Sequence, residues 1–241
     1  MLFNSFEFLL FLPTVFCLYW FVFQKSLRTQ NLLLLISSYI FYGWWDWRFL
    51  SLIFFSTVVD YLIGLQIYYN KNINVKKSYL WISIFFNLSL LGFFKYFNFF
   101  IDSWINLLSL LGYEHKSTWT LDILLPVGIS FYTFQTMSYP LDIYFKKLKP
   151  TKDFISFASF VSFFPQLVAG PIERASNLLP QILNIRVFKY EKGVQGLRLI
   201  LWGMFKKVVI ADLLALHVDT IFENYSTLNG GVLLLGLVYF S

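Results

Sequence analysis

The sequence predicts an all-α, polytopic membrane protein, and two properties of the chain carry that prediction. Of its 241 residues, 58% are hydrophobic and only 13% are charged, and the mean hydropathy is +0.63. A soluble domain carries about 25% charged residues, so a soluble protein of this length could not bury so much apolar surface. The uncharged runs also far exceed the roughly 10 residues of a membrane-barrel strand, which favours helices.

Uncharged runs mark the expected membrane segments, because about 20 such residues cross the hydrocarbon core. An aromatic stretch, Tyr96–Ile101, continues the fourth run beyond Lys95, and Ser103–Tyr113 is too short to cross and is expected to be half-inserted. In chain order the runs are Phe8–Gln24, Thr29–Trp45, Phe49–Asn70 (interrupted by Asp60), Ser78–Phe94, Ile123–Leu141, Phe154–Ile172, Val194–Leu216 and Asn224–Ser241.

Basic residues lie in the short connections between these runs, as in cytoplasmic loops. If the first four runs cross, Ser103–Tyr113 stays outside and Phe154–Ile172 returns to its own side, the opposite connections hold only Arg48 and Lys116. This asymmetry predicts a multi-pass protein with its N-terminus outside, and it explains the net charge of +6 without nucleic acid. The 14 residues on the cytoplasmic side are Lys25, Arg28, Lys71, Lys76, Lys77, Lys146, Lys147, Lys149, Lys152, Arg174, Arg186, Lys189, Lys192 and Arg198.

The run Phe154–Ile172 is unsuited to a simple spanning helix. Pro165 removes a backbone donor, and Pro171 disfavours helical geometry at Gly170. In a bilayer the freed carbonyls need partners, so such breaks survive only against protein or a water-filled cavity. We therefore expect a broken, re-entrant element beside a cavity. The polar groups expected to contribute to this path are Gln166, Glu173 and Arg174.

A second stretch, Leu125–Tyr144, has the same design. Pro126 and Gly128 are expected to loosen its start, and Pro140 is expected to break its end. Gln135 and Tyr139 are four residues apart and share a helical face. Polar side chains at such positions either hold helices together or line a pathway, and the sequence leaves both roles open.

Charges inside membrane segments are costly and mark candidate functional groups. Asp60 is expected either to pair with Lys95 of a neighbouring helix or to accept structural hydrogen bonds. Lys207 and Asp212 are five residues apart and therefore not on one face of an α-helix, so a pair within one helix is not expected. Lys206 and Lys207 either snorkel from a helix end or contribute to the cavity.

Other residue types exclude several kinds of chemistry. The two histidines, His115 and His217, have no neighbouring nucleophile and no acidic or cysteine cluster that would hold a metal. The one cysteine, Cys17, is expected to be a small buried hydrophobe. No phosphate-binding loop of the P-loop type occurs. We expect no metal and no catalytic residue within these 241 residues.

Two further segments are expected at the membrane surface. Three tryptophans at the outer end of the second run, Trp44, Trp45 and Trp47, are typical of an interfacial aromatic belt. The segment Ile172–Arg198 mixes apolar and basic residues, which is typical of an amphipathic helix lying in the cytoplasmic interface.

Five motifs in order along the whole chain resemble the membrane-bound O-acyltransferase family. Within it, the chain is most similar to the alginate O-acetyltransferase branch, a relative of the teichoic-acid D-alanyl transfer proteins. The stretches that carry the resemblance are Ser37–Asp46, Gly92–Phe97, Leu125–Gln135, Phe163–Ile172 and Gly203–Asp212.

The resemblance implies a helical core with broken helices around a tunnel that joins the cytoplasm and the exterior of a bacterial inner membrane. It implies transfer of an acyl group, expected to be acetyl, from acetyl-CoA or an acyl carrier to a polysaccharide hydroxyl outside, with periplasmic acyltransferase partners. The family's catalytic histidine follows a tryptophan in a late span, and neither His115 nor His217 matches that motif. We expect residues 1–241 to form a single domain, the N-terminal half of such an enzyme, truncated before the catalytic region.

Two other classes of function fit parts of the pattern. A transporter or flippase also uses broken helices and polar groups at mid-membrane, but it would show an inverted repeat, which this chain lacks. A non-catalytic membrane scaffold is the third class. The tunnel candidates on which the enzyme hypothesis depends are Gln135, Tyr139, Gln166, Glu173, Arg174, Lys206 and Lys207.

Overall fold

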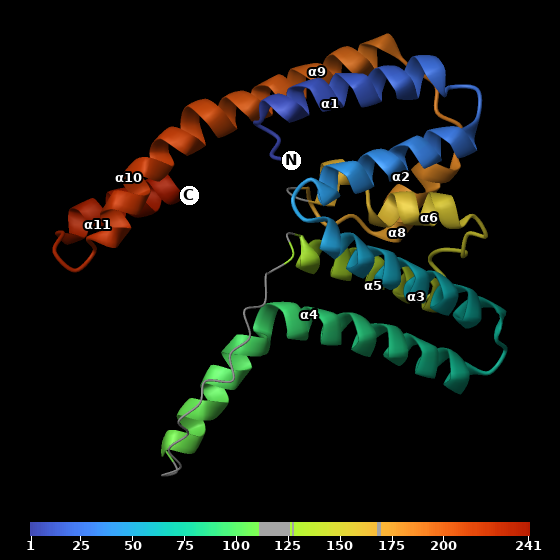
Figure 1. The fold of residues 1–241 in the computed structure, drawn as a ribbon, viewed down its shortest axis with the longest axis horizontal. Helices are drawn as coiled ribbons and strands as arrows, with labels where there is room; N and C mark the ends of the chain where they lie inside the picture. The colour runs from blue at the N-terminus through green and yellow to red at the C-terminus, as the bar shows by residue number, and fades with distance from the viewer. Residues whose placement is uncertain (111–125, 127, 168–169) are drawn as a thin grey trace. The chain divides into compact units, whose positions relative to one another are not determined.

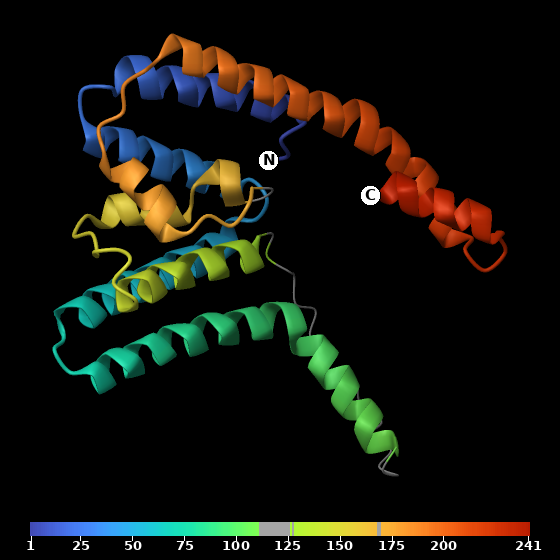
Figure 2. The same cartoon turned by 180° about the vertical axis from the view of Figure 1, so that it is seen from behind.

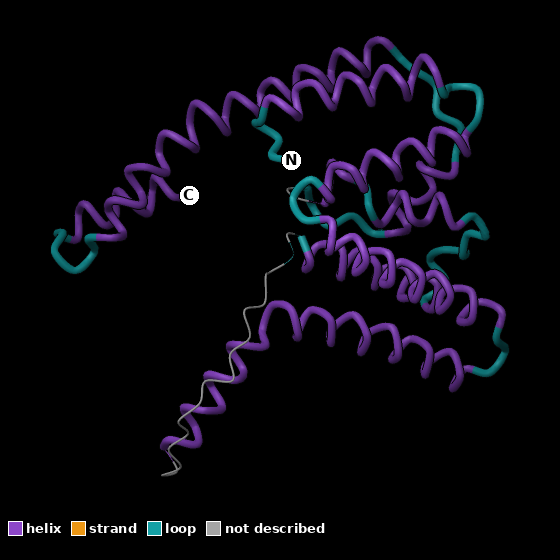
Figure 3. Tube along the Cα trace, viewed as in Figure 1, coloured by secondary structure: helices purple, strands orange, loops and turns teal. Residues whose placement is uncertain are grey.

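The computed structural model describes residues 1–110, 126, 128–167 and 170–241, and their regular elements are all helical (Figure 3). The predicted all-α class is therefore confirmed. The α-helices in chain order are α1 (Phe6–Cys17), α2 (Leu27–Gly43), α3 (Leu50–Tyr69), α4 (Ile73–Leu110), α5 (Ile129–Tyr144), α6 (Phe154–Val161), α7 (Phe164–Leu167), α8 (Ala175–Leu183), α9 (Tyr190–Phe205), α10 (Asp212–Glu223) and α11 (Gly230–Phe240).

Two helices are long and apolar enough to cross a membrane. They are Trp47–Tyr69, which includes a short 3₁₀ turn before α3, and Ile73–Leu110. Shorter apolar helices cover Phe6–Val22, Phe154–Leu167 and Gly230–Phe240. These elements agree with a membrane protein, while the number of passes and the orientation stay predictions.

Helix α4 corrects one sequence expectation. The predicted span Ser78–Phe94 and the described part of the half-inserted segment Ser103–Tyr113 belong to one continuous helix of 38 residues. At 1.5 Å per residue this helix is roughly 57 Å long, about twice the thickness of a hydrocarbon core. The single charges Lys95 and Asp102 interrupt the apolar run but not the backbone hydrogen bonds, and the helix bends instead of ending (Figures 1 and 2).

The chain divides into two compact units, which are described separately. The first comprises Met1 and Pro13–Arg186, and in it α3, α4 and α5 pack on one another (Figure 1). Gly64 makes the close approach of α3 and α5 possible, because a Cβ atom there would lie 2.4 Å from Tyr139 Cε1. Helix α6 packs on α2, α3 and α8, and α8 packs also on α5.

Helix α1 corrects the expectation for the one cysteine. Cys17, expected to be buried, is exposed there, while Val15 faces the core. The reason is that α1 contributes only one stripe to the core and leaves its remaining apolar side chains outside.

A buried polar network fastens α3, α4 and α5 together. Asp60 accepts hydrogen bonds from Ser83 Oγ at 2.5 Å and from Asn87 Nδ2 at 2.8 Å, and all three residues are completely buried. Asn87 Oδ1 in turn accepts from Ser56 Oγ of α3 at 2.9 Å and from Thr136 Oγ1 of α5 at 3.2 Å. The network therefore provides Asn87 with partners from both neighbouring helices, which is the arrangement that buried polar groups require.

Helix α8 corrects the expectation of one interfacial helix over Ile172–Arg198. The helix ends at Leu183, non-helical residues follow, and α9 begins only at Tyr190. The apolar face of α8, formed by Ala175, Leu179 and Ile182, is buried against protein and is not available to lipid. An amphipathic pattern predicts a buried face but does not specify what covers it.

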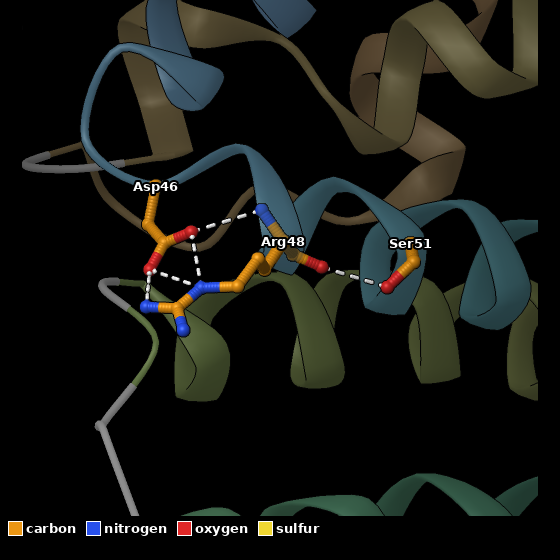
Figure 4. A network of polar contacts seen from close by, with 3 residues as sticks. All are labelled: Asp46, Arg48 and Ser51. Carbon is orange, nitrogen blue, oxygen red and sulfur yellow. Dashed lines mark hydrogen bonds and ion pairs between the residues drawn. The ribbon is translucent and has the colours of Figure 1, made fainter.

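Hydrogen bonds and an ion pair between Asp46 and Arg48 stabilise the turn between α2 and α3 (Figure 4). Asp46 accepts from the backbone N–H of Arg48 at 2.9 Å and from the Arg48 guanidinium, with Nη2 at 2.6 Å from Oδ2. These hydrogen bonds hold the pKa of the Asp46 carboxyl below its ordinary value. The adjacent tryptophans Trp44, Trp45 and Trp47 are 57–75% exposed, as an interfacial belt requires.

The second unit comprises Leu2–Leu12 and Val187–Ser241. Helix α9 continues through a π-helical stretch, Lys206–Ala211, into α10, and α11 folds back on α10. A Cβ atom at Gly236 would lie 2.8 Å from Ile221 Cγ2, so the glycine permits this close packing. Among the residues of α9 and the π-helical stretch none is buried, so this unit presents a large apolar surface.

Candidate functional site

The two broken segments predicted from the sequence meet at Gly128. This residue immediately precedes α5 and has φ = 74°, the left-handed conformation that glycine adopts without steric cost. A Cβ atom at Gly128 would lie 2.5 Å from the backbone oxygen of Leu167, the last residue of α7. The predicted loosening before α5 is therefore confirmed, and its structural use is a close backbone contact with α7.

The break between α6 and α7 lies where Pro165 predicts it. Helix α6 ends at Val161, whose carbonyl would need the N–H that proline lacks. The break also separates Phe160 O from Phe164 N, two groups that an unbroken α-helix would join. Both find substitutes from other helices: Gln135 Nε2 donates to Phe160 O at 2.7 Å, and Phe164 N donates to Ser38 Oγ at 3.2 Å.

Gly170 is packed against the end of α7. Its N–H donates to Gln166 O at 3.0 Å, and a Cβ atom on it would lie 2.7 Å from Gln166 Cα. The chain is not helical at Gly170 and Pro171, as the proline predicts. The broken character of Phe154–Ile172 is thus confirmed within its described residues, while its re-entrance into a membrane stays a prediction.

Three buried polar atoms of α5 and α7 have no hydrogen-bond partner in the described part of the chain. They are Tyr132 Oη, Thr133 Oγ1 and Gln166 Nε2. Their residues are 1%, 1% and 6% exposed, respectively. A buried polar group without a partner costs about 1–3 kcal/mol, so each requires an explanation such as water or a ligand. These atoms lie on the two helices whose ends meet at Gly128 and Leu167.

Gln135 and Tyr139 face the protein interior from α5. Gln135 satisfies the α6 carbonyl, and Tyr139 Oη accepts from the backbone N–H of Thr151 at 3.1 Å. The Tyr139 ring also packs on Phe157 of α6, with ring centroids 4.3 Å apart. Both side chains therefore hold helices together, and their further role as tunnel lining stays a prediction.

Pro140 does not break α5, contrary to the sequence expectation. The helix continues to Tyr144, and the chain turns at Lys146, which has φ = 60°. A proline this close to the end removes only the bond to the carbonyl four residues earlier, and packing on both sides holds the last turn.

Glu173 and Arg174 lie at the start of α8 and do not form an ion pair with each other in the described structure. Glu173 Oε2 accepts from Asn177 Nδ2 at 3.4 Å, and Arg174 is the exposed residue that precedes the helix. The start of α8 is satisfied from α5, since Ser138 Oγ accepts from Ala175 N and Asp142 Oδ2 accepts from Ser176 N. A role for Glu173 and Arg174 in a path stays a prediction.

Lys206 and Lys207 lie in the second unit. Contrary to expectation, Lys207 Nζ pairs with Asp212 Oδ1 at 2.6 Å within one continuous helical stretch. The reason is the π-helix Lys206–Ala211, in which hydrogen bonds join residues five apart and bring positions i and i+5 onto one face. Lys206 lies over the Trp202 ring, 5.2 Å from its centroid.

Asp60 and Lys95 do not pair. Asp60 is the structural acceptor of the buried network, whereas Lys95 Nζ donates to Ser130 Oγ at 3.3 Å. His217 lies near the Tyr239 ring, and His115 lies outside the described residues. Among the described residues no group of histidine, cysteine and acidic side chains could hold a metal ion.

The sequence did not predict a role for several residues of α5 that the structure singles out. Tyr132 and Thr133 lie inside the segment that was singled out, but burial without a partner has no signature in sequence. Ser138 and Asp142 were missed because the α8 backbone that they satisfy lies more than 30 residues away. One signal was available for Tyr132: it follows Gly128 by one helical turn and so shares its face.

Proteins similar to this chain are named as O-acetyltransferases. The chain is 39% identical to a probable alginate O-acetylase of Pseudomonas aeruginosa over 242 residues, covering 99% of this chain and 45% of that protein. A probable alginate O-acetylase of Pseudomonas syringae pv. tomato matches equally well. A peptidoglycan O-acetyltransferase of Helicobacter pylori is 34% identical over 258 residues, 95% of this chain and 48% of that protein.

These matches confirm the resemblance to the alginate O-acetylase branch of the membrane-bound O-acyltransferase family. The chain spans about half the length of the curated relatives that it matches, as a partial-length resemblance predicts. No family model matches the chain. No solved structure matches it either.

Proposed function

We propose that this chain is the part of a membrane O-acetyltransferase that builds the path of the transferred group. In this proposal the complete enzyme moves an acetyl group from a cytoplasmic donor to a polysaccharide hydroxyl outside the membrane. The names of the similar proteins support the reaction class. The observation that carries the assignment of the path is the set of unpartnered buried atoms on Tyr132, Thr133 and Gln166.

These three side chains carry buried hydrogen-bond donors. A buried donor without an acceptor destabilises the protein. Tyrosine and threonine hydroxyls and an amide N–H₂ can all donate to a carbonyl or alcohol oxygen. An acyl group and its hydroxyl acceptor both carry such oxygens, and an apolar protein environment strengthens the hydrogen bonds that form. We assign to this chain the positioning of the group and the exclusion of water.

Bond making is assigned to residues other than these. Gln135 and Tyr139, the two tunnel candidates on α5, are used in contacts that hold the helices together. We propose that the catalytic histidine expected from the resemblance acts in the part of the enzyme that this chain does not span. On this basis the isolated chain is inactive.

The donor and the partners follow from the same proposal. The predicted cytoplasmic face carries most of the basic residues, which suits an anionic donor such as acetyl-CoA or an acyl carrier. The acceptor is a polysaccharide on the opposite side, reached directly or through a periplasmic acyltransferase. The site of action is the bacterial cytoplasmic membrane, with the N-terminus outside.

A chimera tests the proposal. In the Pseudomonas aeruginosa relative, the matching 242-residue portion is replaced by this chain, and the chimera is produced in alginate-making cells that lack their own O-acetylase. Restored O-acetyl groups on alginate, measured by proton nuclear magnetic resonance, are the expected result. The chain alone, supplied with acetyl-CoA and alginate or peptidoglycan, is expected to transfer nothing.

The matched control carries the corresponding portion of the Helicobacter pylori relative in the same position. If that chimera acetylates either polymer while the chimera with this chain reaches the membrane in equal amount and acetylates neither, the proposed function is wrong. Transfer by the chain alone would instead overturn the assignment of catalysis to other residues.

A further inference from the structure

Arg186 is a cation held in place by neutral groups. It follows α8 in the chain, precedes α9 and is half-buried. Its Nη2 donates to Asn31 Oδ1 at 2.5 Å and approaches Gln30 Oε1 at 3.5 Å, and its guanidinium carbon lies 5.3 Å from the centroid of the Tyr19 ring. Each of these contacts orients the guanidinium, and none of them neutralises its charge.

The other two guanidinium nitrogens of Arg186, Nε and Nη1, carry N–H groups that donate to no acceptor in the described structure. Of these two nitrogens, Nε is buried. No carboxylate pairs with Arg186 in the described part of the chain, where the ion pairs are Arg48–Asp46 and Lys207–Asp212. Arg48 is an instructive contrast, because Asp46 accepts from both Nε and Nη2 of its guanidinium.

The groups that hold Arg186 are themselves fixed. Asn31 is completely buried, and its Nδ2 donates to Ser156 Oγ at 2.8 Å and to Ile182 O at 3.1 Å. Gln30 is 2% exposed and donates through Nε2 to Tyr19 O at 3.2 Å. The acid reached through this network, Asp153, accepts from Ser156 and is therefore two side chains removed from Arg186.

The surroundings add positive charge. Asn31 and Gln30 belong to the first turns of α2, which begins at Leu27 and carries Arg28, and Lys25 precedes it. Partial burial lowers the pKa of the Arg186 guanidinium, which means that the protein alone does not compensate for the lost hydration of this charge. An arginine fixed in this way is suited to an anion such as phosphate, which can present two oxygens to the guanidinium group.

We propose that Arg186, oriented by Asn31, Gln30 and Tyr19, binds a phosphate group at the membrane surface. A phosphate oxygen accepts from Nη1, which the protein leaves without an acceptor. This inference does not rest on the proposed transferase function. The bound phosphate group can belong to the headgroup of an anionic phospholipid or to a soluble phosphate ester. The experiment below distinguishes these two sources.

The experiment measures thermal unfolding of the purified full chain in a maltoside detergent, which contains no phosphate, by intrinsic tryptophan fluorescence. The probes, at constant ionic strength, are phosphatidylglycerol in mixed micelles, coenzyme A, and the neutral lipid diacylglycerol. For the unaltered chain, at least one phosphate probe raises Tm in a saturable way, while diacylglycerol does not. A response to phosphatidylglycerol alone assigns the lipid source, and a response to coenzyme A alone assigns the soluble source.

Three variants make the test specific. Arg186→Met is expected to weaken the apparent affinity for the probe by roughly 10- to 100-fold, the loss typical of charged hydrogen bonds. Gln30→Glu places a carboxylate beside the guanidinium in a nearly unchanged shape, so the folded variant should lose the phosphate response as well. Arg198→Met removes an exposed charge of α9 and should respond like the unaltered chain.

The outcomes divide clearly. The proposal is supported if Gln30→Glu unfolds cooperatively and no longer responds while Arg198→Met does respond. It is overturned if no phosphate probe stabilises the unaltered chain, or if Gln30→Glu responds as strongly as the unaltered chain. The second criterion holds even if Arg186→Met fails to fold.

Discussion

At the scale of single residues, two contacts decide how the broken segments meet. Gly128 brings its backbone against the Leu167 carbonyl, and Gln135 replaces the helical partner that Phe160 O loses at the α6–α7 break. The first contact leaves no room for a side chain at Gly128, and the second satisfies a backbone carbonyl freed by the helix break, away from water. The unpartnered side-chain atoms of Tyr132, Thr133 and Gln166 lie on the helices α5 and α7 that meet here.

We expect Gly128→Ala to destabilise the chain by at least about 2 kcal/mol, because alanine is strained at positive φ and its Cβ would strike the Leu167 oxygen. Thermal unfolding in detergent measures the effect. Gly92→Ala is the matched control, since an added Cβ meets nothing within 4 Å there and the change should be neutral or stabilising by up to about 1 kcal/mol. Equal Tm values for the two variants would contradict the close contact between Gly128 and Leu167.

We expect Asn87→Leu to cost roughly 2–5 kcal/mol, because it removes one of the hydrogen bonds to the buried Asp60 carboxyl and the amide oxygen that accepts from the Ser56 and Thr136 hydroxyls. Chemical unfolding in mixed micelles provides the measurement. Asn106→Leu makes the same change on the exposed part of α4 and should alter stability by less than about 0.5 kcal/mol. A similar small effect at both positions would show that the network contributes nothing to stability.

At the scale of elements, irregular helices separate this chain from a simple bundle. The α6–α7 break precedes Pro165, whereas the π-helical stretch Lys206–Ala211 contains neither proline nor glycine. The Lys207–Asp212 pair spans that stretch and would be lost in regular α-geometry, where residues five apart point in different directions. π-helical turns occur frequently at functional sites, which keeps Lys206 and Lys207 among the candidates for a path.

The π-helix predicts which residues can be cross-linked. In a Cys17→Ser background, cysteines replacing Lys206 and Ala211, the first and last residues of the stretch, should form an internal disulfide on mild oxidation. The Lys207–Asp212 pair stays intact in this variant. The same spacing in regular α-helix, with cysteines replacing Leu197 and Trp202, should not cross-link, because positions five apart diverge there. Mass spectrometry distinguishes the products, and cross-linking at both pairs or at neither would contradict the assignment.

At the scale of the whole molecule, the described part of the chain is a set of helices that exposes many large hydrophobic side chains. Large hydrophobic side chains such as Phe85, Leu110 and Phe240 are more than 70% exposed, which a bilayer or further protein must cover. The basic residues of the connections then determine how the molecule sits in the membrane.

Orientation is testable by accessibility. Single cysteines in a Cys17→Ser background replace Trp45, in the predicted outer turn, and Asn72 and Lys149, in predicted cytoplasmic connections; all three positions are exposed. A membrane-impermeant maleimide should label the first in intact spheroplasts and the other two only after permeabilisation. The reverse pattern would show that the N-terminus is cytoplasmic and that the charge asymmetry was misinterpreted.

The sequence by itself determined the properties that depend on composition and on local backbone chemistry. It predicted the helical class, the family resemblance, the loosened start at Gly128 and the break at Pro165, because proline and glycine act through their own dihedral angles and missing donors. It failed where local signals compete with packing: Pro140 lies within α5, and the described part of Ser103–Tyr113 continues α4 instead of forming a separate short segment.

The tertiary structure alone decided which groups are partners. That Gln135 serves Phe160, that Asp60 is bound to Ser83 and Asn87 rather than to Lys95, and that Arg186 has only neutral partners all follow from contacts between residues distant in sequence. The Lys207–Asp212 pair depends likewise on a π-helical hydrogen-bond pattern that no residue type specifies. Polar satisfaction is a property of three-dimensional neighbours, so a sequence can show that a polar group is present but not whether it is paired.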